Sequence, residues 1–205
     1  MKIFCIGWNY PQHNNEMHRA DLPSEPTLFM KPDTALLREN KPFFLPHFSN
    51  QVEHEVEVVV RINRVGRNIQ ERFAQRYYNE IGLGVDFTAR DLQNRCKEKG
   101  QPWEIAKAFD NSAVVSEFMP LAEFGKDVQD LNFELWKNGE LQQKGYSGDM
   151  LFKVNRIIEY ISGFFTLKVG DIIFTGTPAG VSKVAIDDHL VGRLEGHDMF
   201  DFYVK

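Results

Sequence analysis

Residues 52–62 read Val-Glu-His-Glu-Val-Glu-Val-Val-Val-Arg-Ile, a run that turns from alternating charge into valine. The valine-rich part predicts a β-strand, because β-branched side chains favour extended backbone. Alternate side chains of a strand share a face, so Glu53, Glu55 and Glu57 point one way and His54 points the other. Neighbouring carboxylates on that face lie only about 7 Å apart. Their repulsion must be offset, either by water on an exposed face or by a bound cation.

A further carboxylate, Asp86, interrupts an apolar, glycine-punctuated strand predicted over residues 81–87. A buried carboxylate is costly unless it is paired or bound to a metal. As a simpler alternative Asp86 caps the end of this strand, a role for which Thr88 and Asp91 compete. Together with the glutamates of residues 53–57, Asp86 supplies a three-carboxylate site with open positions for water or substrate. A hard cation such as Mg²⁺ or Mn²⁺ prefers such oxygen ligands.

A third candidate element is a strand over residues 171–175 that runs into a Gly- and Thr-rich loop ending near Val181. The loop is not a Walker A motif, because it lacks the Gly-Lys-Ser/Thr ending. Its backbone N–H groups and the Thr177 hydroxyl are suited to binding a carboxylate. An ordinary turn at the end of a strand explains the same residues equally well.

The whole chain, residues 1–205, predicts a single strand-rich α+β domain, since strands outnumber helices and no linker separates them. Asn138-Gly139 is a strong hairpin signal, because both residues tolerate positive φ. The two strands of that hairpin are expected on either side of it. The expected strands not yet named are residues 3–6, 27–30, 131–137, 140–144 and 200–204.

Two helices are expected. Residues 69–78 predict a partly solvated helix, and from Leu151 onward apolar residues recur at intervals of three and four, which predicts a helix with one buried face. Ser147 or Asp149 would cap the start of the second helix, and Gly163 would end it.

Composition limits the partners. Of the 205 residues 42% are hydrophobic, and the net charge of −5 gives no electrostatic reason to expect nucleic acid or an anionic membrane. A small anionic substrate stays possible, because a metal ion reverses the local field. Cys5 and Cys96 form neither a disulfide framework nor a CxxC pair, which indicates a reducing compartment. The chain shows no signal peptide and no apolar run near the roughly 20 residues of a membrane span, so a cytoplasmic protein is expected.

Six stretches, taken in this order, resemble the fumarylacetoacetate hydrolase superfamily and reach across nearly the whole chain. They are residues 7–10, 29–32, 55–57, 86–93, 106–110 and 170–181. Pro102-Trp103 and Val114-Val115-Ser116 are more similar to the small acylpyruvase and oxaloacetate decarboxylase branch. Many bacterial isomerase members carry Gly-Pro in the latter region, and this sequence does not.

The resemblance implies a strongly twisted, mixed β-roll or β-sandwich with peripheral helices, commonly a homodimer. It also implies that Glu55, Glu57 and Asp86 bind Mg²⁺ or Mn²⁺ as cofactor. It thereby selects two of the three glutamates and leaves Glu53 without an assigned role.

His13 and Glu16 lie three residues apart, which places them on one face of a helix. On their own they suit an exposed pair on a surface helix. They match the family's His-x-x-Glu pair, which sits on a mobile lid, here residues 9–22, and in which the carboxylate raises the basicity of the imidazole. Further residues fall on family positions that line the pocket. Lys107 is expected to act with the catalytic pair, and the expected substrate-binding residues are Lys31, Arg90, Gln93 and Thr177.

The implied activity is metal-dependent cleavage of a C–C bond in a small 2-oxo acid. Acylpyruvate hydrolysis, oxaloacetate decarboxylation or both would proceed through a metal-stabilised pyruvate enolate. For a 2,4-dioxo acid, His13 with Glu16 would activate water. The first alternative is an isomerase, tautomerase or hydratase that acts on a 2-hydroxy-diene-dioate or a 2-oxo acid in aromatic catabolism. The second is a non-catalytic binding protein on the same fold.

Overall fold

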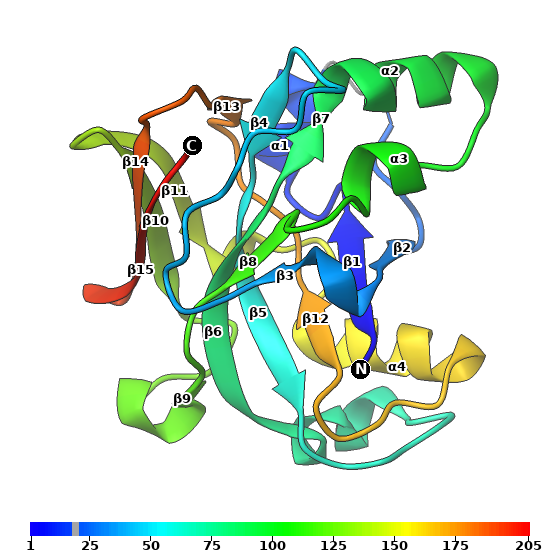
Figure 1. The fold of residues 1–205 in the computed structure, drawn as a ribbon. Helices are drawn as coiled ribbons and strands as arrows, with labels where there is room; N and C mark the ends of the chain where they lie inside the picture. Colours follow the sequence, from blue (N-terminus) through cyan, green and yellow to red (C-terminus); the bar gives the residue numbers. More distant parts are fainter. Residues whose placement is uncertain (18–20) are drawn as a thin grey trace.

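A computed structural model describes residues 1–17 and 21–205, in which two stacked, twisted sheets dominate (Figure 1). The large sheet is mixed: most of its strand pairs are antiparallel, but β1 pairs with β12 in parallel and β3 pairs with β8 in parallel. In spatial order it contains β2 (Thr27–Lys31), β1 (Ile3–Gly7), β12 (Ile172–Phe174), β5 (Val56–Ile62), β6 (Tyr78–Asp86), β8 (Ala113–Val115) and β3 (Leu36–Leu37), with β9 (Met119–Pro120) paired to β6.

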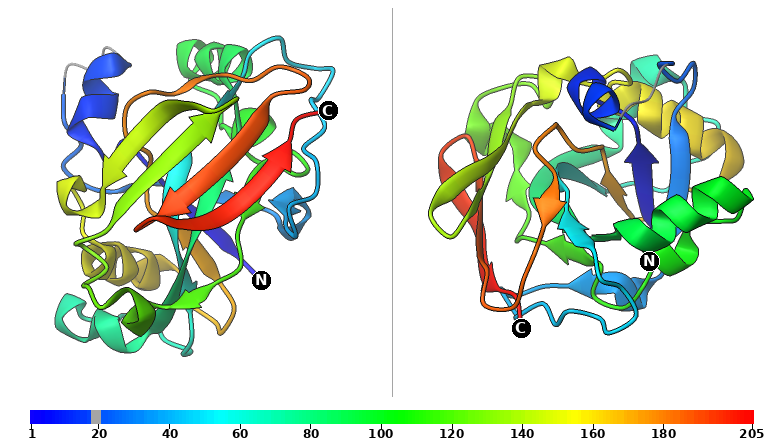
Figure 2. Two further views of the ribbon diagram at one scale, coloured as in Figure 1. Left: turned by 90° about the vertical axis from the view of Figure 1, so that its left-hand side faces the viewer. Right: turned by 90° about the horizontal axis from the view of Figure 1, so that it is seen from above.

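A second, antiparallel sheet covers one face of the large one, as Figure 2 shows. The hairpin predicted at Asn138-Gly139 is confirmed, with φ of 55° and 81° at these two residues. Both angles are positive, which is why Asn and Gly are favoured there. The sheet contains β11 (Glu140–Tyr146), β10 (Asn132–Lys137), β14 (His189–Leu194) and β15 (His197–Tyr203) in this order.

The run over residues 52–62 is not one continuous strand, because it is broken at Glu55. β4 (Val52–His54) belongs to a small sheet, where it pairs with β13 (Ser182–Lys183) and β7 (Thr88–Ala89). After Glu55 the chain enters the large sheet as β5. The break places Glu55 at the junction of the small sheet and the large sheet.

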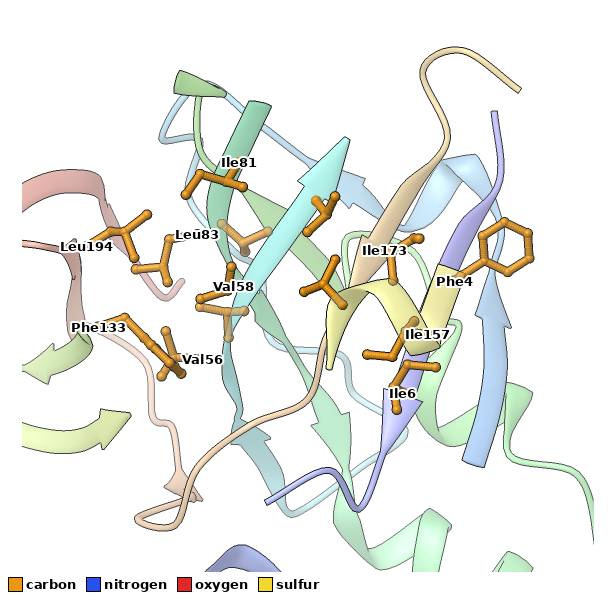
Figure 3. Packing of buried hydrophobic residues seen from close by; sticks show 14 of the residues in the cluster. Phe4, Ile6, Val56, Val58, Ile81, Leu83, Phe133, Ile157, Ile173 and Leu194 are labelled. Carbon is orange, nitrogen blue, oxygen red and sulfur yellow. The ribbon is translucent and has the colours of Figure 1, made fainter. Parts of the chain in front are cut away.

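The valines of β5 are buried on both faces of the large sheet. Val56 and Val58 face the second sheet, where they pack with Phe133 and Leu194 (Figure 3). Val59 points to the opposite face and packs in another apolar cluster with strands β1 and β12. Burying each valine contributes roughly 1.5–3 kcal/mol. The core therefore fixes β5 in register, and with it the neighbouring glutamates.

Four α-helices lie at the edge of the sheets among the described residues: α1 (Pro11–Glu16), α2 (Arg90–Lys99), α3 (Glu104–Lys107) and α4 (Val154–Phe164). The apolar face predicted for α4 is confirmed, since Val154, Ile157 and Ile161 are buried. Its predicted ends are wrong. The helix starts after Lys153 without a side-chain cap, and Gly163 lies inside its last turn.

The helix expected over residues 69–78 is also wrong. A short 3₁₀ segment, η2 (Glu71–Arg76), stands there, and Tyr78 already begins β6. The segment buries Ala74 alone, so it lacks the apolar stripe that holds an α-helix on a core. Three further 3₁₀ turns are η1 (Asp33–Ala35), η3 (Leu121–Phe124) and η4 (Ser147–Asp149).

The expected strand-rich α+β fold, with twisted stacked sheets and peripheral helices, is confirmed. None of the helices in the described part of the chain has both the length and the apolar character needed to cross a bilayer. Of the predicted lid, residues 9–22, residues 18–20 lie outside the described part.

Candidate metal and catalytic site

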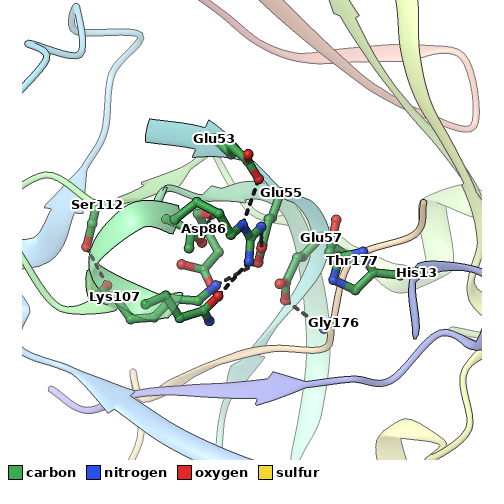
Figure 4. A network of polar contacts seen from close by, with 12 residues as sticks. His13, Glu53, Glu55, Glu57, Asp86, Lys107, Ser112, Gly176 and Thr177 are labelled. Carbon is green, nitrogen blue, oxygen red and sulfur yellow. Dashed lines mark hydrogen bonds and ion pairs between the residues drawn. The ribbon is translucent and has the colours of Figure 1, made fainter. Parts of the chain in front are cut away.

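The carboxylates of Glu55, Glu57 and Asp86 converge where β4, β5 and β6 meet (Figure 4). Strand pairing brings them together: Glu57 lies opposite Gly84 on β6, and the N–H of Asp86 donates to the carbonyl of Glu55 at 2.8 Å. One oxygen of each carboxylate lies within 4.8 Å of the others, and all three residues are buried. Such a cluster could hold a divalent cation.

Gly84 and Gly176 allow the backbone to approach this cluster. A Cβ at Gly84 would lie 2.6 Å from the Val114 carbonyl oxygen, so no larger residue fits between β6 and β8. Gly176 has a φ of +105°, which L-residues rarely adopt, and its N–H donates to Glu57 Oε2 at 2.6 Å. The loop after β12 therefore holds the Glu57 carboxylate through a backbone N–H group.

Two basic side chains neutralise one end of the carboxylate cluster. Lys107 Nζ donates to Glu55 Oε2 at 2.7 Å and to Asp86 Oδ2 at 2.8 Å. Arg90 donates to Glu55 at 2.5 Å and to Glu53 at 2.7 Å. Burial opposes ionisation of Glu55, but Lys107 and Arg90 outweigh it and hold the Glu55 pKa below its ordinary value. Burial also opposes the charge on Lys107, whose pKa is nevertheless raised by Asp86 and Glu55.

Glu57 is compensated less: the Gly176 N–H and the more distant charge of Lys107 lower its pKa, but burial and the neighbouring carboxylates outweigh them. Burial, followed by the charges of Asp86 and Glu55, raises the Glu57 pKa well above its ordinary value. Among the described residues no basic side chain pairs with Glu57. A buried carboxylate of this kind needs either a proton or a cation.

Asp86 Oδ1 accepts no hydrogen bond from any described residue. Lys31 Nζ lies 2.7 Å from this oxygen, but its N–H groups point to the Lys107 carbonyl and to both oxygens of Ser112. The contact is therefore an ion pair, and no donor among the described residues is aligned with this oxygen for a hydrogen bond. Together with Glu57, this makes the site fit a hard divalent ion such as Mg²⁺ or Mn²⁺.

His13 and Glu16 form a hydrogen-bonded pair at the edge of the same site. His13 Nδ1 lies 3.2 Å from Glu16 Oε2, and the N–H of Gly180 donates to Glu16 Oε1 at 3.0 Å. Burial works against the charge of Glu16, but these two hydrogen bonds outweigh it and lower the Glu16 pKa. An ionised carboxylate has no proton to donate, so in the neutral form of the imidazole Nδ1 carries the hydrogen and Nε2 the lone pair.

One pocket joins the carboxylate cluster to His13. All the residues predicted for the site line this pocket except Glu16 and Lys31. Glu16 contacts the pocket residue His13, and Lys31 contacts the pocket residue Asp86. The lining residues are Ile6, Gly7, Trp8, His13, Phe29, Glu55, Glu57, Asp86, Arg90, Gln93, Trp103, Lys107 and Thr177.

Two polar residues of the pocket wall are held by neighbours. Gln93 accepts a hydrogen bond from Arg90 at 2.7 Å. Thr177 Oγ1 donates to the Val56 carbonyl at 2.9 Å and accepts from Gln143 Nε2 at 2.8 Å. The Thr177 hydroxyl hydrogen is thus used within the protein, and the hydroxyl oxygen faces Gln143. The Thr177 hydroxyl therefore has less to offer a ligand than its place in the sequence indicates.

The sequence analysis did not select several residues that the structure places in or beside the site. Glu53 pairs with Arg90, and the rings of Trp8, Phe29 and Trp103 form the apolar wall of the pocket. Gln143 comes from β11 in the other sheet. Trp8 and Phe29 fall in stretches that carry the family resemblance, which is the signal that would have selected them. Nothing in the sequence around Gln143 singles it out.

Comparisons with known proteins identify the family of this chain. The family model for the C-terminal part of fumarylacetoacetate (FAA) hydrolase matches residues 2–200. Oxaloacetate tautomerase YcgM of *Escherichia coli* (strain K12) is 43% identical over 198 residues, which are 97% of this chain and 90% of that protein. Mitochondrial oxaloacetate tautomerase FAHD1 of *Homo sapiens* is 41% identical over 203 residues, 99% of this chain and 91% of that protein.

Solved structures are similar over the whole chain. A fumarylacetoacetate hydrolase family protein of *Yersinia pestis* CO92 superposes with a TM-score of 0.95 at 40% identity, over 100% of this chain and 93% of that one. Fumarylpyruvate hydrolase of *Pseudomonas aeruginosa*, in complex with Mn²⁺ and pyruvate, superposes with a TM-score of 0.94 at 31% identity, over 100% of this chain and 89% of that one.

Proposed function

Because the chain belongs to the fumarylacetoacetate hydrolase family, we propose that it enolises a small 2-oxo acid with the help of a divalent cation, and that oxaloacetate is its substrate. The reaction is the interconversion of the keto and enol forms. The observation that carries this proposal is the position of His13: its ring shares one pocket with the three carboxylates, and Glu16 holds its Nδ1. A base beside a cation site is what proton abstraction next to a carbonyl requires.

Glu55, Glu57 and Asp86 would hold Mg²⁺ or Mn²⁺. When bound there, the ion supplies a Lewis acid that favours negative charge on the 2-oxo oxygen of the substrate. The buried Glu57 carboxylate, which no described basic side chain pairs with, supports this assignment. The Mn²⁺ in the *P. aeruginosa* relative supports it independently.

The residues of the chain would move the proton. Nε2 of His13 accepts a proton from C3 of the substrate. The electron pair of that C–H bond becomes the second bond between C2 and C3, and the π pair of the C2 carbonyl moves onto its oxygen. The imidazolium then returns the proton to the C2 oxygen, which completes the enol. Glu16 stabilises the imidazolium, because the Glu16 carboxylate is ionised and hydrogen-bonded to Nδ1. Lys107 and Arg90 keep Glu55 ionised and in place.

The direct test is the exchange of the C3 hydrogens of oxaloacetate for deuterium, followed by NMR in the presence of Mg²⁺. We expect His13→Ala to slow this exchange about 100-fold or more, the usual size of a general-base contribution. His197→Ala is the matched control, since His197 is exposed on β15. Full exchange by the His13→Ala variant would contradict the proposal.

Cleavage of a C–C bond is the second candidate, favoured by the likeness to fumarylpyruvate hydrolase. The same His13 Nε2 would take a proton from a water molecule while the water oxygen adds to the distal carbonyl carbon of an acylpyruvate. The bond between that carbon and C3 then breaks, and pyruvate leaves after C3 regains a proton. For oxaloacetate, loss of CO₂ needs no water. A coupled assay of pyruvate release from acetylpyruvate and oxaloacetate separates cleavage from exchange.

Two outcomes of this pair of assays decide between the candidates. Exchange much faster than pyruvate release supports the tautomerase, and pyruvate release at an equal or higher rate supports cleavage. Neither reaction, with substrate still bound, would indicate a non-catalytic binding protein. The homodimer and the lid over residues 9–22 remain predictions from the family resemblance, and light scattering of the purified protein tests the first of them.

A further inference from the structure

An aromatic and basic rim, defined as Trp8, Trp103 and Lys97, lies beside the pocket: the two indoles line the pocket, and the Lys97 ammonium contacts both rings. Lys97 Nζ lies 4.6 Å from the ring centroid of Trp8 and 5.7 Å from that of Trp103. The two indoles contact each other edge-on, with centroids 6.5 Å apart, and both line the pocket. All three side chains are half-buried, so the rim is reachable from both the pocket and the solvent. The ammonium is therefore held against the aromatic wall by cation–π contacts.

Helix α2 connects this rim to the buried carboxylates. Arg90, Gln93 and Lys97 are spaced by three and four residues, so they lie on one face of the helix. Arg90 and Gln93 line the pocket. Lys97 follows two turns beyond Arg90, about 10 Å along the helix axis. The same helix face thus carries a basic group at each end.

The charge of the buried site explains why a second basic group is needed. Seven charged side chains share the buried site: the carboxylates of Glu53, Glu55, Glu57 and Asp86 and the basic groups of Lys31, Arg90 and Lys107. Together they leave one negative charge, which a divalent cation turns into one positive charge. The carboxylate next to the 2-oxo group of a substrate cancels that charge. Among the described residues of the buried site no positive charge is then left for a second carboxylate, and the Glu16 carboxylate adds a further negative charge.

We propose that Lys97, held by Trp8 and Trp103, recognises the second carboxylate of a dicarboxylic 2-oxo acid. This inference rests on the proposed function and deepens it, because it names the residue that would select a 2-oxo acid with an anionic tail over one with an apolar tail. Lys97 is then a specificity residue, since it acts on the far end of the substrate and not on the C3 proton.

Two matched ligand pairs test this assignment. Oxaloacetate and 2-oxobutyrate differ by a carboxylate in place of a methyl group, and both exchange C3 hydrogens. Malate and 2-hydroxybutyrate differ in the same way but have no 2-oxo group to enolise. Exchange by NMR gives kcat/KM for the first pair. Quenching of tryptophan fluorescence, to which Trp8 and Trp103 of the rim contribute, gives Kd for the second pair in the presence of Mg²⁺.

We expect Lys97→Met to lower the preference for the dicarboxylate about fivefold in both pairs, the size expected for a half-exposed charge pair. Lys97→Arg should restore most of the preference, because it keeps the charge. Lys99→Met is the control, since Lys99 is exposed in the last turn of the same helix. Raising the salt concentration should reduce the preference of the wild-type protein and leave that of Lys97→Met unchanged.

An unchanged preference in Lys97→Met, or the same change in Lys99→Met, would overturn the assignment. A loss of both members of a pair to the same extent would also overturn it, because it would indicate damage to the fold. Failure of the proposed function shows differently. In that case the wild-type protein exchanges neither 2-oxo acid, while the malate and 2-hydroxybutyrate titrations still decide the role of Lys97.

Discussion

Replacing Glu57 by Gln should stabilise the metal-free protein and at the same time remove its response to divalent cations. Glu57 is buried, and no basic side chain among the described residues pairs with it. Its oxygens lie within 4.8 Å of those of Glu55 and Asp86, which corresponds to about 3 kcal/mol of repulsion per neighbour at an effective dielectric constant of about 20. Lys107 offsets part of this repulsion, so we expect a net gain of about 1–3 kcal/mol.

The pH dependence has a definite sign. The raised Glu57 pKa means that the native state holds this proton more tightly than the unfolded chain does. The metal-free protein therefore has the full Glu57 contribution below the ordinary glutamate pKa of 4.5 and loses it as the pH rises toward the native pKa. The Glu57→Gln variant lacks this titration. Its advantage over the wild-type protein should consequently grow from acidic to neutral pH.

The assay is urea unfolding at pH 5 and pH 7.5, in EDTA and in excess Mg²⁺ or Mn²⁺. A ligand at 100 times its Kd stabilises the native state by about 2.7 kcal/mol, and we expect that gain for the wild-type protein only. Glu53→Gln is the matched control, because Glu53 is paired with Arg90. Its loss should destabilise the protein with and without metal. A Glu57→Gln variant that is less stable than wild type in EDTA would refute the reasoning.

Three further changes test the surrounding structure. Gln143→Leu removes an amide that makes four buried hydrogen bonds, and we expect a loss of about 2–4 kcal/mol in the free energy of unfolding, measured in urea. Gly180→Ala places a Cβ 2.2 Å from the Gln142 carbonyl oxygen at a φ of +99°, so thermal unfolding should show a loss of about 1–3 kcal/mol. Burial, with help from Asp127, raises the Tyr78 pKa to about 12. The unfolded chain loses that proton first, so the wild-type protein should lose about 1–3 kcal/mol more than Tyr78→Phe as the pH rises from 10 to 12.

The strands and the carboxylate cluster could be predicted because their signals are local or belong to the family. Valine enrichment identifies β5, and Asn138-Gly139 identifies the β10–β11 hairpin. Residue spacing alone could not choose among the three glutamates. The resemblance chose Glu55 and Glu57, and the structure adds that Glu53 is paired with Arg90.

The features that could not be predicted depend on contacts between distant segments. Helix α2 buries the polar residues Arg90 and Gln93 together with Cys96, so it has no apolar stripe to indicate a helix. Only Gly100, at its C-terminus with a φ of 62°, gives a local signal. The role of Gln143 is set by its neighbours on β5 and in the loop after β12. Such a role exists only once the sheets have stacked.

The alternation of faces over residues 52–57 makes the length of this segment as important as its composition. His54 turns away from the pocket, toward Gln143 and Ser182, while the carboxylates on either side turn toward Arg90. Inserting or deleting one residue between β4 and β5 would exchange the two faces. An imidazole would then stand among the basic groups, and glutamates would face the Gln143 amide. Among homologues aligned on this stretch, substitutions should therefore be far more common than gaps.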